Sequence, residues 1–214
     1  MNLNQELLSV LKQEGCDIVG FADLRILPEE PRKKLDTGII IGVPYVPAGM
    51  QMKREDNPIR FADGGGGTFE PLERYNQVTV QFLKERKYKA NVKYSTTQIT
   101  MKMLATIAGL GWIGKCAILT TKETGPALRF TAVLTNAPFE HGTPITKSQC
   151  PPDCTECADA CPTKAIKGGL WERGIHRDEF FDVEACKKHR NKVDGYCCIC
   201  MSACPFTKQG LGYE

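Results

Sequence analysis

The chain has 214 residues, of which 42% are hydrophobic and 25% charged, and its formal net charge at pH 7 is +3. This length and composition indicate a folded protein with room for one ordinary domain and a small second one, not a disordered chain. The charge is too small for the pronounced basic surface of a nucleic-acid-binding protein, and no apolar run approaches the ~18 residues of a membrane-spanning helix.

The first residues and the cysteine content together indicate a compartment. Residues 1–6 contain neither the basic segment nor the apolar core that begins a secretory signal, so we expect a cytoplasmic protein. In that reducing compartment the eleven cysteines would serve metal binding or redox chemistry, not disulfides.

The first 43 residues predict the start of a layered domain. Residues 3–13 carry leucine and valine on one helical face, and Gly15 supplies a C-terminal stop. Cys16 to Ala22 then has the apolar pattern of a strand, and Ile39 to Val43 is a continuous apolar run typical of a strand buried on both faces. A helix, a strand, a linker and a buried strand together favour a mixed α/β (α+β) fold.

Residues 44–67 form a long connection that contains three prolines and the run Gly64 to Gly67. A phosphate-binding loop would continue with Gly-Lys-Ser or Gly-Lys-Thr, whereas Thr68-Phe69-Glu70 follows here. We therefore interpret the connection as a flexible loop, with an active-site lid as the alternative.

The middle of the chain predicts two helices and two strands. Apolar residues recur at helical spacing across 68–86 and again across 98–108. Val92 and Tyr94 indicate a strand between these helices, and Ala127 to Asn136 alternates in the manner of a further strand.

The segment from residue 109 to 115 has the spacing G-x-G-x-x-G. A dinucleotide-binding site would need a strand before it and a helix after it, but here a helix precedes and Cys116 to Thr121 is predicted as a strand. Two interpretations remain. The segment is a tight turn packed under its tryptophan, or its glycines let the backbone approach a large flat cofactor while the lysine is free to meet a phosphate or carboxylate. The candidate cofactor contacts are Gly109, Gly111, Trp112, Gly114 and Lys115.

A cysteine motif occurs twice near the C-terminus. The motif Cys-x2-Cys-x3-Cys-Pro begins at Cys154 and again, forty-three residues later, at Cys197. Such a repeat is typical of two [4Fe-4S] clusters, because neighbouring thiolates hold one cluster while the Cys-Pro thiolate reaches the other. Zinc, which also favours paired cysteines, is the alternative.

The crossed pattern divides the cysteines between 150 and 204 into two ligand sets and leaves one thiol over. One cluster takes Cys150, Cys154, Cys157 and Cys204, and the other takes Cys161, Cys186, Cys197 and Cys200. Cys198 is then the spare thiol, although it could replace a neighbouring ligand. Cys16 and Cys116 lie outside the group and are predicted to be small buried hydrophobic residues.

The segment Met103 to Lys115, the strand from Ala127 with its ending Thr135 to Pro138, and the two Cys-Pro motifs follow one another in this order. The ordered combination resembles the epoxyqueuosine reductases and is more distantly similar to the corrinoid reductive dehalogenases. The resemblance implies a nitroreductase-like α/β domain at 1–145 that binds cobalamin, followed at 146–214 by a bacterial-ferredoxin-like module with two [4Fe-4S] clusters. The clusters would pass single electrons to cobalt and generate Co(I), a strong nucleophile and reductant, beside the glycine segment.

Two features depart from the tRNA-modifying members of that family. Their proposed proton donor, an aspartate, corresponds to Met101, which cannot donate a proton, and their C-terminal helical repeats have no counterpart before Glu214. We therefore expect a small-molecule or protein-bound substrate instead of tRNA epoxyqueuosine, an electron donor such as ferredoxin or flavodoxin, and neither nucleic acid nor membrane as a partner. The catalytic residue stays unidentified. The alternative is an electron-transfer or accessory protein that serves a partner.

Overall fold

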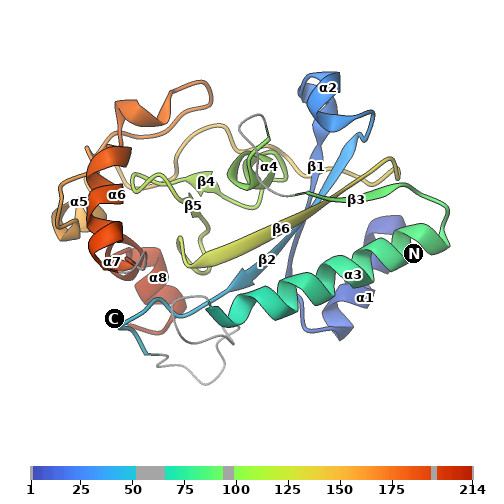
Figure 1. Ribbon diagram of the computed structural model, residues 1–214, viewed down its shortest axis with the longest axis horizontal. Coiled ribbons are helices and arrows are strands. Elements are labelled where there is room, and N and C mark those ends of the chain that lie inside the picture. Colours follow the sequence, from blue (N-terminus) through green and yellow to red (C-terminus); the bar gives the residue numbers. More distant parts are fainter. Residues whose placement is uncertain (1, 52–65, 94–98, 194–196, 214) are drawn as a thin grey trace. The chain divides into compact units, whose positions relative to one another are not determined.

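The computed structural model describes residues 2–51, 66–93, 99–193 and 197–213. The chain divides into two compact units (Figure 1). Unit 1 comprises Met1–Val43, Thr68–Leu110 and Arg129–Ile145, and unit 2 comprises Pro44–Gly67, Gly111–Leu128 and Thr146–Glu214.

A four-stranded sheet forms the centre of unit 1, with its strands in the order β1-β2-β6-β3. The strands are β1 (Ile18–Asp23), β2 (Thr37–Pro44), β3 (Ala90–Lys93) and β6 (Leu128–Thr135). β1 pairs antiparallel with β2, and β3 pairs antiparallel with β6. β2 lies inside the sheet and is buried along almost its whole length, as its continuous apolar run predicted. The other three predicted strands of this unit are also confirmed, although Tyr94 lies outside the described residues.

Helices cover this sheet. Unit 1 contains α1 (Leu3–Gln13), η1 (Leu24–Ile26), α2 (Glu29–Arg32), α3 (Phe69–Glu85) and α4 (Met101–Ile107), and η2 (Gly66–Thr68) precedes α3. α1 packs against α3, α3 against β3, and α4 against β1 (Figure 1). α1 begins where the Asn2 side chain accepts a hydrogen bond from the backbone of Gln5, and it buries Leu7 and Leu11 one turn apart. The predicted helices and the mixed α/β fold are therefore confirmed, apart from residue 98, which is outside the described range.

Unit 2 consists of short elements joined by long connections. They are β4 (Trp112–Ile113), β5 (Leu119–Thr120), α5 (Glu156–Ala160), η3 (Arg177–Glu179), α6 (Val183–Lys192), α7 (Ile199–Ser202) and α8 (Pro205–Gly210). β4 and β5 form an antiparallel pair in which Trp112 lies opposite Thr120.

This pair corrects the single strand predicted over Cys116 to Thr121. The chain reverses after β4, where the Ala117 backbone N–H donates to the Gly114 carbonyl at 2.8 Å and Ala117 adopts a φ of +60°. An alanine in this left-handed conformation gives no signal in the sequence, because glycine is the residue usually found there. The result is a hairpin of two short strands.

Residues 44–67 and 111–128, which the sequence analysis assigned to the first domain, group with unit 2. The Tyr45 backbone N–H donates to the Ala127 carbonyl at 3.0 Å, and the Thr207 hydroxyl donates to the Thr124 carbonyl at 3.3 Å. The first hydrogen bond joins the two segments to each other, and the second joins residues 111–128 to the C-terminal part of the chain. The glycine run at 64–65 lies outside the described residues, so the loop and lid interpretations stay predictions.

In the part of the chain that the structure describes, no helix has the length and the apolar character needed to cross a lipid bilayer.

Candidate metal centres

Four cysteines from distant segments line one cavity in unit 2. The cavity is small, about 20 Å³, and its wall includes Cys150, Cys154, Cys157 and Cys204. These four residues, the first cysteine set, are the ones that the crossed spacing assigned to one cluster. The same wall also includes Gly114, Lys115, Cys116 and Phe206. The arrangement supplies four thiols around a space, which is what a four-cysteine iron–sulfur cluster requires.

The other four predicted ligands, Cys161, Cys186, Cys197 and Cys200, form the second cysteine set. Cys161, Cys186 and Cys200 pack in one largely apolar group. Cys197 lies close enough to Cys186 to influence its ionisation. Burial raises the pKa of the Cys186 thiol, the charge of Arg190 opposes this shift, and the neighbouring Cys197 and Cys161 thiols reinforce it.

The two Cys-Pro steps explain why the last cysteine of each motif lies beside the cysteines of the other motif. Cys161 is the C-cap of α5 with a ψ of 115°, and Cys204 is the N-cap of α8 with a ψ of 127°. This extended backbone is the conformation that a following proline favours. The chain changes direction at each of these two cysteines. As a result, Cys204 lines the cavity of the first motif, and Cys161 packs with Cys186 and Cys200.

Burial in the first set disfavours the negatively charged thiolate form of its cysteines. Burial raises the pKa of Cys157 to about 12 and that of Cys204 to about 11. Cys161 of the second set differs: burial acts to raise its pKa, but hydrogen bonds from the Thr163 side chain and from the backbone lower it overall. A metal that binds these thiols as thiolates must displace protons, so metal loading and local folding are coupled here.

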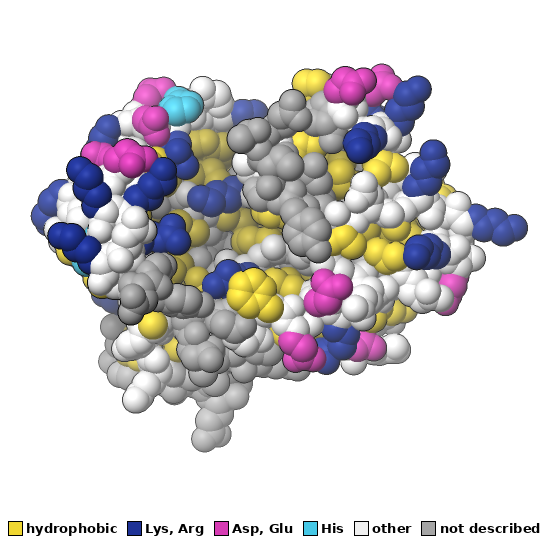
Figure 2. Space-filling model, in the orientation of Figure 1, with side chains coloured by type: hydrophobic (Ala, Val, Ile, Leu, Met, Phe, Trp, Pro, Cys, Tyr) yellow, Lys and Arg dark blue, Asp and Glu magenta, His cyan; other side chains and the backbone are white. Residues whose placement is uncertain are grey.

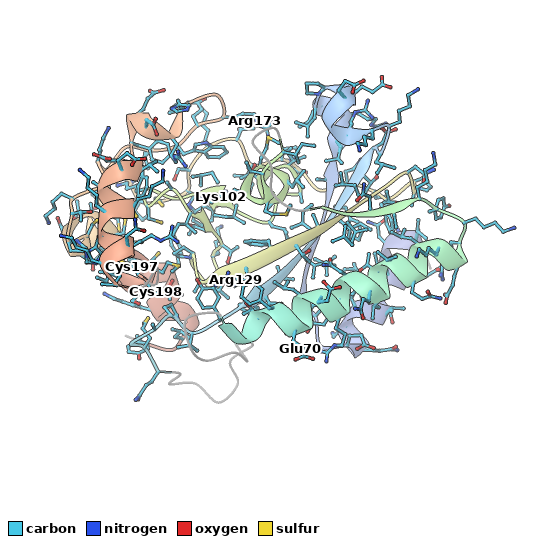
Figure 3. The ribbon with its side chains drawn as sticks, in the orientation of Figure 1. Glu70, Lys102, Arg129, Arg173, Cys197 and Cys198 are labelled. Carbon is cyan, nitrogen blue, oxygen red and sulfur yellow. The ribbon has the colours of Figure 1, made fainter. Side chains whose placement is uncertain are left out.

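Cys198 is buried in a group against which Cys200 of the second set also packs. The group also contains Tyr45 and Met201, and the Tyr45 hydroxyl donates to Met201 Sδ at 3.2 Å. Figure 3 shows Cys197 and Cys198 beside α7, where the chain enters that short helix. Both cysteines line one pocket, so the assignment of Cys198 as the spare thiol stays a prediction.

Cys116 was not recognised as part of the site from the sequence. It is buried, as predicted, but it lies on the cavity wall of the first cysteine set and also packs with Cys161. No spacing rule identifies it, because it comes far ahead of Cys150 and reaches the cavity through the β4–β5 hairpin. Cys16, by contrast, is buried in unit 1 as a small apolar residue.

The predicted cofactor segment is occupied by contacts within the protein. A side chain at Gly109 would meet the Thr143 carbonyl oxygen at 2.5 Å, and one at Gly111 would meet the Thr120 carbonyl oxygen even more closely. A side chain at Gly114 would meet Thr120 Oγ1 at 2.6 Å. The three glycines are therefore explained by close approach of the chain to itself. Their predicted contact with cobalamin stays a prediction.

Trp112 and Lys115 both contact the cysteine-bearing loop. The Trp112 indole N–H donates to Cys150 Sγ at 3.3 Å, and its ring meets Phe206 edge-on with centroids 5.3 Å apart. The Lys115 ammonium donates to the carbonyls of Pro152 at 2.7 Å and Cys154 at 2.8 Å. The sequence analysis expected a lysine free to meet a phosphate or carboxylate, whereas these carbonyls hold it inside unit 2.

The spacing of ligands bears on the zinc alternative. A zinc ion draws four ligands to about 2.0–2.3 Å from one point. Among residues 2–51, 66–93, 99–193 and 197–213, no three Cys, His, Asp or Glu side chains are grouped in a way that could hold a single metal ion. Zinc and iron–sulfur binding therefore both stay predictions for the two cysteine sets.

Comparison with known proteins agrees with the resemblance found in the motifs. Over 114 residues the chain is 35% identical to the tetrachloroethene reductive dehalogenase of Sulfurospirillum multivorans, covering 49% of this chain and 23% of that protein. Over 207 residues it is 28% identical to the epoxyqueuosine reductase of Lactococcus garvieae, covering 87% of this chain and 56% of that protein. The similarity to epoxyqueuosine reductases and reductive dehalogenases is therefore confirmed, although the chain spans only about half or less of these relatives. No protein-family model matches the chain.

Solved structures show the same likeness at the level of the fold. A selenomethionine-labelled epoxyqueuosine reductase superposes with a TM-score of 0.68 at 19% identity, covering 96% of this chain and 66% of that one. A reductive dehalogenase structure described as suggesting a mechanism for B12-dependent dehalogenation gives a TM-score of 0.61 at 17% identity, covering 92% and 31%. The mixed α/β fold is thus shared with both groups of enzymes.

Proposed function

We propose that this protein is an iron–sulfur oxidoreductase similar to epoxyqueuosine reductase, in which unit 2 holds two [4Fe-4S] clusters. The observation that carries the proposal is the crossed arrangement of the two cysteine sets, in which Cys204 joins the first motif and Cys161 joins the second. This exchange is the pattern of two-cluster ferredoxins, so Thr146–Glu214 would be a bacterial-ferredoxin-like module. Unit 1, with its four-stranded sheet and covering helices, would be the nitroreductase-like domain.

The clusters, when bound, supply one-electron transfer at low potential. The protein's own part is to exclude water and to fix the thiols. Cys116 and Cys161 are buried among apolar side chains, and the Cys-Pro steps hold one ligand of each set at a helix end. Electrons would enter from a partner such as a ferredoxin or flavodoxin and leave to an acceptor bound by the protein.

Cobalamin is the acceptor that the relatives favour, because the dehalogenase structure is described as B12-dependent. The five residues of the glycine segment do not fit the role of an open cofactor wall, since Thr143, Thr120 and two carbonyls already occupy their approach. We therefore derive no step through cobalamin. Its binding is a question for experiment.

A second candidate function is favoured by that same packing. A protein whose glycine segment is closed, and which has Met101 where the tRNA-modifying relatives carry their acid, could pass electrons to a partner without performing chemistry itself. Met101 begins α4 and offers no proton. The two functions differ in whether this chain binds the acceptor.

The substrate follows less directly from the structure. Met101 argues against tRNA epoxyqueuosine, and a small-molecule or protein-bound substrate is proposed instead. Figure 2 shows Lys and Arg interspersed with Asp and Glu over the face drawn. That mixture, together with a net charge of +3, is unlike the continuous basic surface that binds nucleic acid.

The test is anaerobic reconstitution with iron and sulfide, followed by titration with cobalamin. The reductase function predicts binding and an optical change of the cobalt centre when the clusters are reduced. Eight irons per chain without cobalamin binding at high micromolar concentration would instead establish the electron-transfer function. A chain that takes up no cluster would refute both.

A further inference from the structure

We propose that Trp112 and Lys115 set the reduction potential of the cluster held by the first cysteine set. The segment Gly111–Lys115 would then belong to the cluster site and not to the wall of a second cofactor. This inference rests on the proposed function in one respect, namely that the first cysteine set binds a [4Fe-4S] cluster.

Lys115 carries a buried positive charge whose hydrogen bonds supply no negative charge. Its side chain is 3% exposed, and its ammonium donates to the carbonyls of Pro152 and Cys154. A buried ammonium held by neutral acceptors is costly unless an anion lies nearby. Lys115 also lines the cavity of the first cysteine set, and a cluster bound there by four thiolates would be that anion.

Trp112 adds a directed hydrogen bond to one predicted ligand. Its indole N–H lies 3.3 Å from Cys150 Sγ, and the ring is 1% exposed. The edge contact with Phe206 fixes the orientation of the ring. Hydrogen bonds to the sulfurs of a cluster, together with nearby positive charge, favour its reduced state, because reduction adds a negative charge.

The two side chains act on opposite ends of the same loop. Trp112 contacts Cys150 at its start, and Lys115 contacts the carbonyl of Cys154 at its end. A side chain at Gly114 would meet Thr120 Oγ1 at 2.6 Å, so glycine there permits the packing of the hairpin that carries Trp112 and Lys115. All of these contacts go to the first set, so they should raise the potential of the first cluster and leave that of the second unchanged.

The test is a redox titration, followed by electron paramagnetic resonance, of the reconstituted protein without cobalamin. Lys115→Met should retain eight irons and lower the equilibrium constant for one-electron reduction of the first cluster about tenfold or more, which corresponds to about 59 mV. The potential of the second cluster should not change. Lys115→Arg should keep the reduction potential of the first cluster close to that of the wild type, because arginine keeps the positive charge. Repeating the titration in Cys200→Ser, which retains the first cluster, assigns the signals.

Lys167→Met is the matched control. Lys167 is exposed in unit 2, and its ammonium also donates to a backbone carbonyl, that of Asp178 at 2.7 Å. Its replacement should leave both potentials unchanged. Equal shifts of both clusters in Lys115→Met, or no shift with eight irons retained, would overturn the inference.

Trp112→Phe provides an independent measurement that does not depend on the lysine. Phenylalanine keeps an aromatic ring but removes the N–H, so the first cluster should again become harder to reduce while the second is unaffected. If Lys115→Met fails to load its first cluster, Trp112→Phe and Lys115→Arg decide the matter, and an unmoved potential in Trp112→Phe refutes the inference. A wild-type protein that binds no cluster would refute the proposed function itself, which is a distinct result.

Discussion

Replacing Gly111 by alanine tests how tightly the β4–β5 hairpin is packed. The added Cβ would approach the Thr120 carbonyl oxygen to less than 3.0 Å, a separation that real Cβ atoms essentially never show, and its two nearest neighbours are backbone atoms. The pairing of Trp112 with Thr120 must therefore shift. Overpacking costs about 1–3 kcal/mol and a disturbed hydrogen bond about 1 kcal/mol, so we expect Gly111→Ala to lose about 2–4 kcal/mol of stability.

The assay compares the urea midpoint and the iron content of anaerobically reconstituted protein. Gly168→Ala is the control, because Gly168 also lies in unit 2 with open space around it, and its φ of +86° would strain only the backbone of the alanine. Its cost should be about 1 kcal/mol, with eight irons retained. Gly111→Ala should lose both stability and iron, since Trp112 leaves Cys150. The reasoning is refuted if Gly111→Ala matches the control in both respects and loses cobalamin affinity alone.

Three further outcomes are expected. Cys198→Ser should retain eight irons per chain, whereas Cys197→Ser should retain about four; four irons in Cys198→Ser would show that the spare thiol is misassigned. Burial raises the pKa of Cys16 from 9.0 to about 11. Its thiol should therefore react with iodoacetamide at pH 8 far more slowly in the folded protein than in the unfolded protein. The free energy of unfolding should also fall as pH rises from about 9 to 11, because the unfolded state loses its proton first. Arg25 lowers the pKa of Asp23 from 3.8 to about 2. The Asp23 carboxylate therefore stabilises the folded state above pH 3.8, and this stabilisation is lost as pH falls towards 2. In urea titrations Asp23→Asn should lower the free energy of unfolding by a few tenths of a kcal/mol near pH 7 and leave it unchanged near pH 2.

Most of unit 1 could be predicted from local pattern. The apolar run in β2 indicates a strand buried on both faces, and the spacing of Leu7 and Leu11 indicates the face of a helix. The hairpin in unit 2 could not be predicted this way. It depends on Ala117 in a left-handed conformation and on Gly111 passing close to the Thr120 carbonyl, and tertiary packing imposes both.

The candidate ligands could be predicted because cluster chemistry dictates their spacing. A short loop carries two thiols to one cluster, and a proline after the third redirects it to the other, so Cys161 and Cys204 could be assigned to opposite sets. The contacts of Cys116, Trp112 and Lys115 with the cysteine loop could not be predicted, because they join segments far apart in sequence. A buried lysine beside a cysteine loop is visible only once the chain has folded.

The most direct test of the central claim is the iron and acid-labile sulfide content of the protein reconstituted under anaerobic conditions. Two [4Fe-4S] clusters predict eight irons and eight sulfides per chain in the wild type, and about four of each in both Cys157→Ser and Cys200→Ser. Four or fewer irons in the wild type, or zinc bound in their place, would contradict the assignment of two clusters to the two cysteine sets.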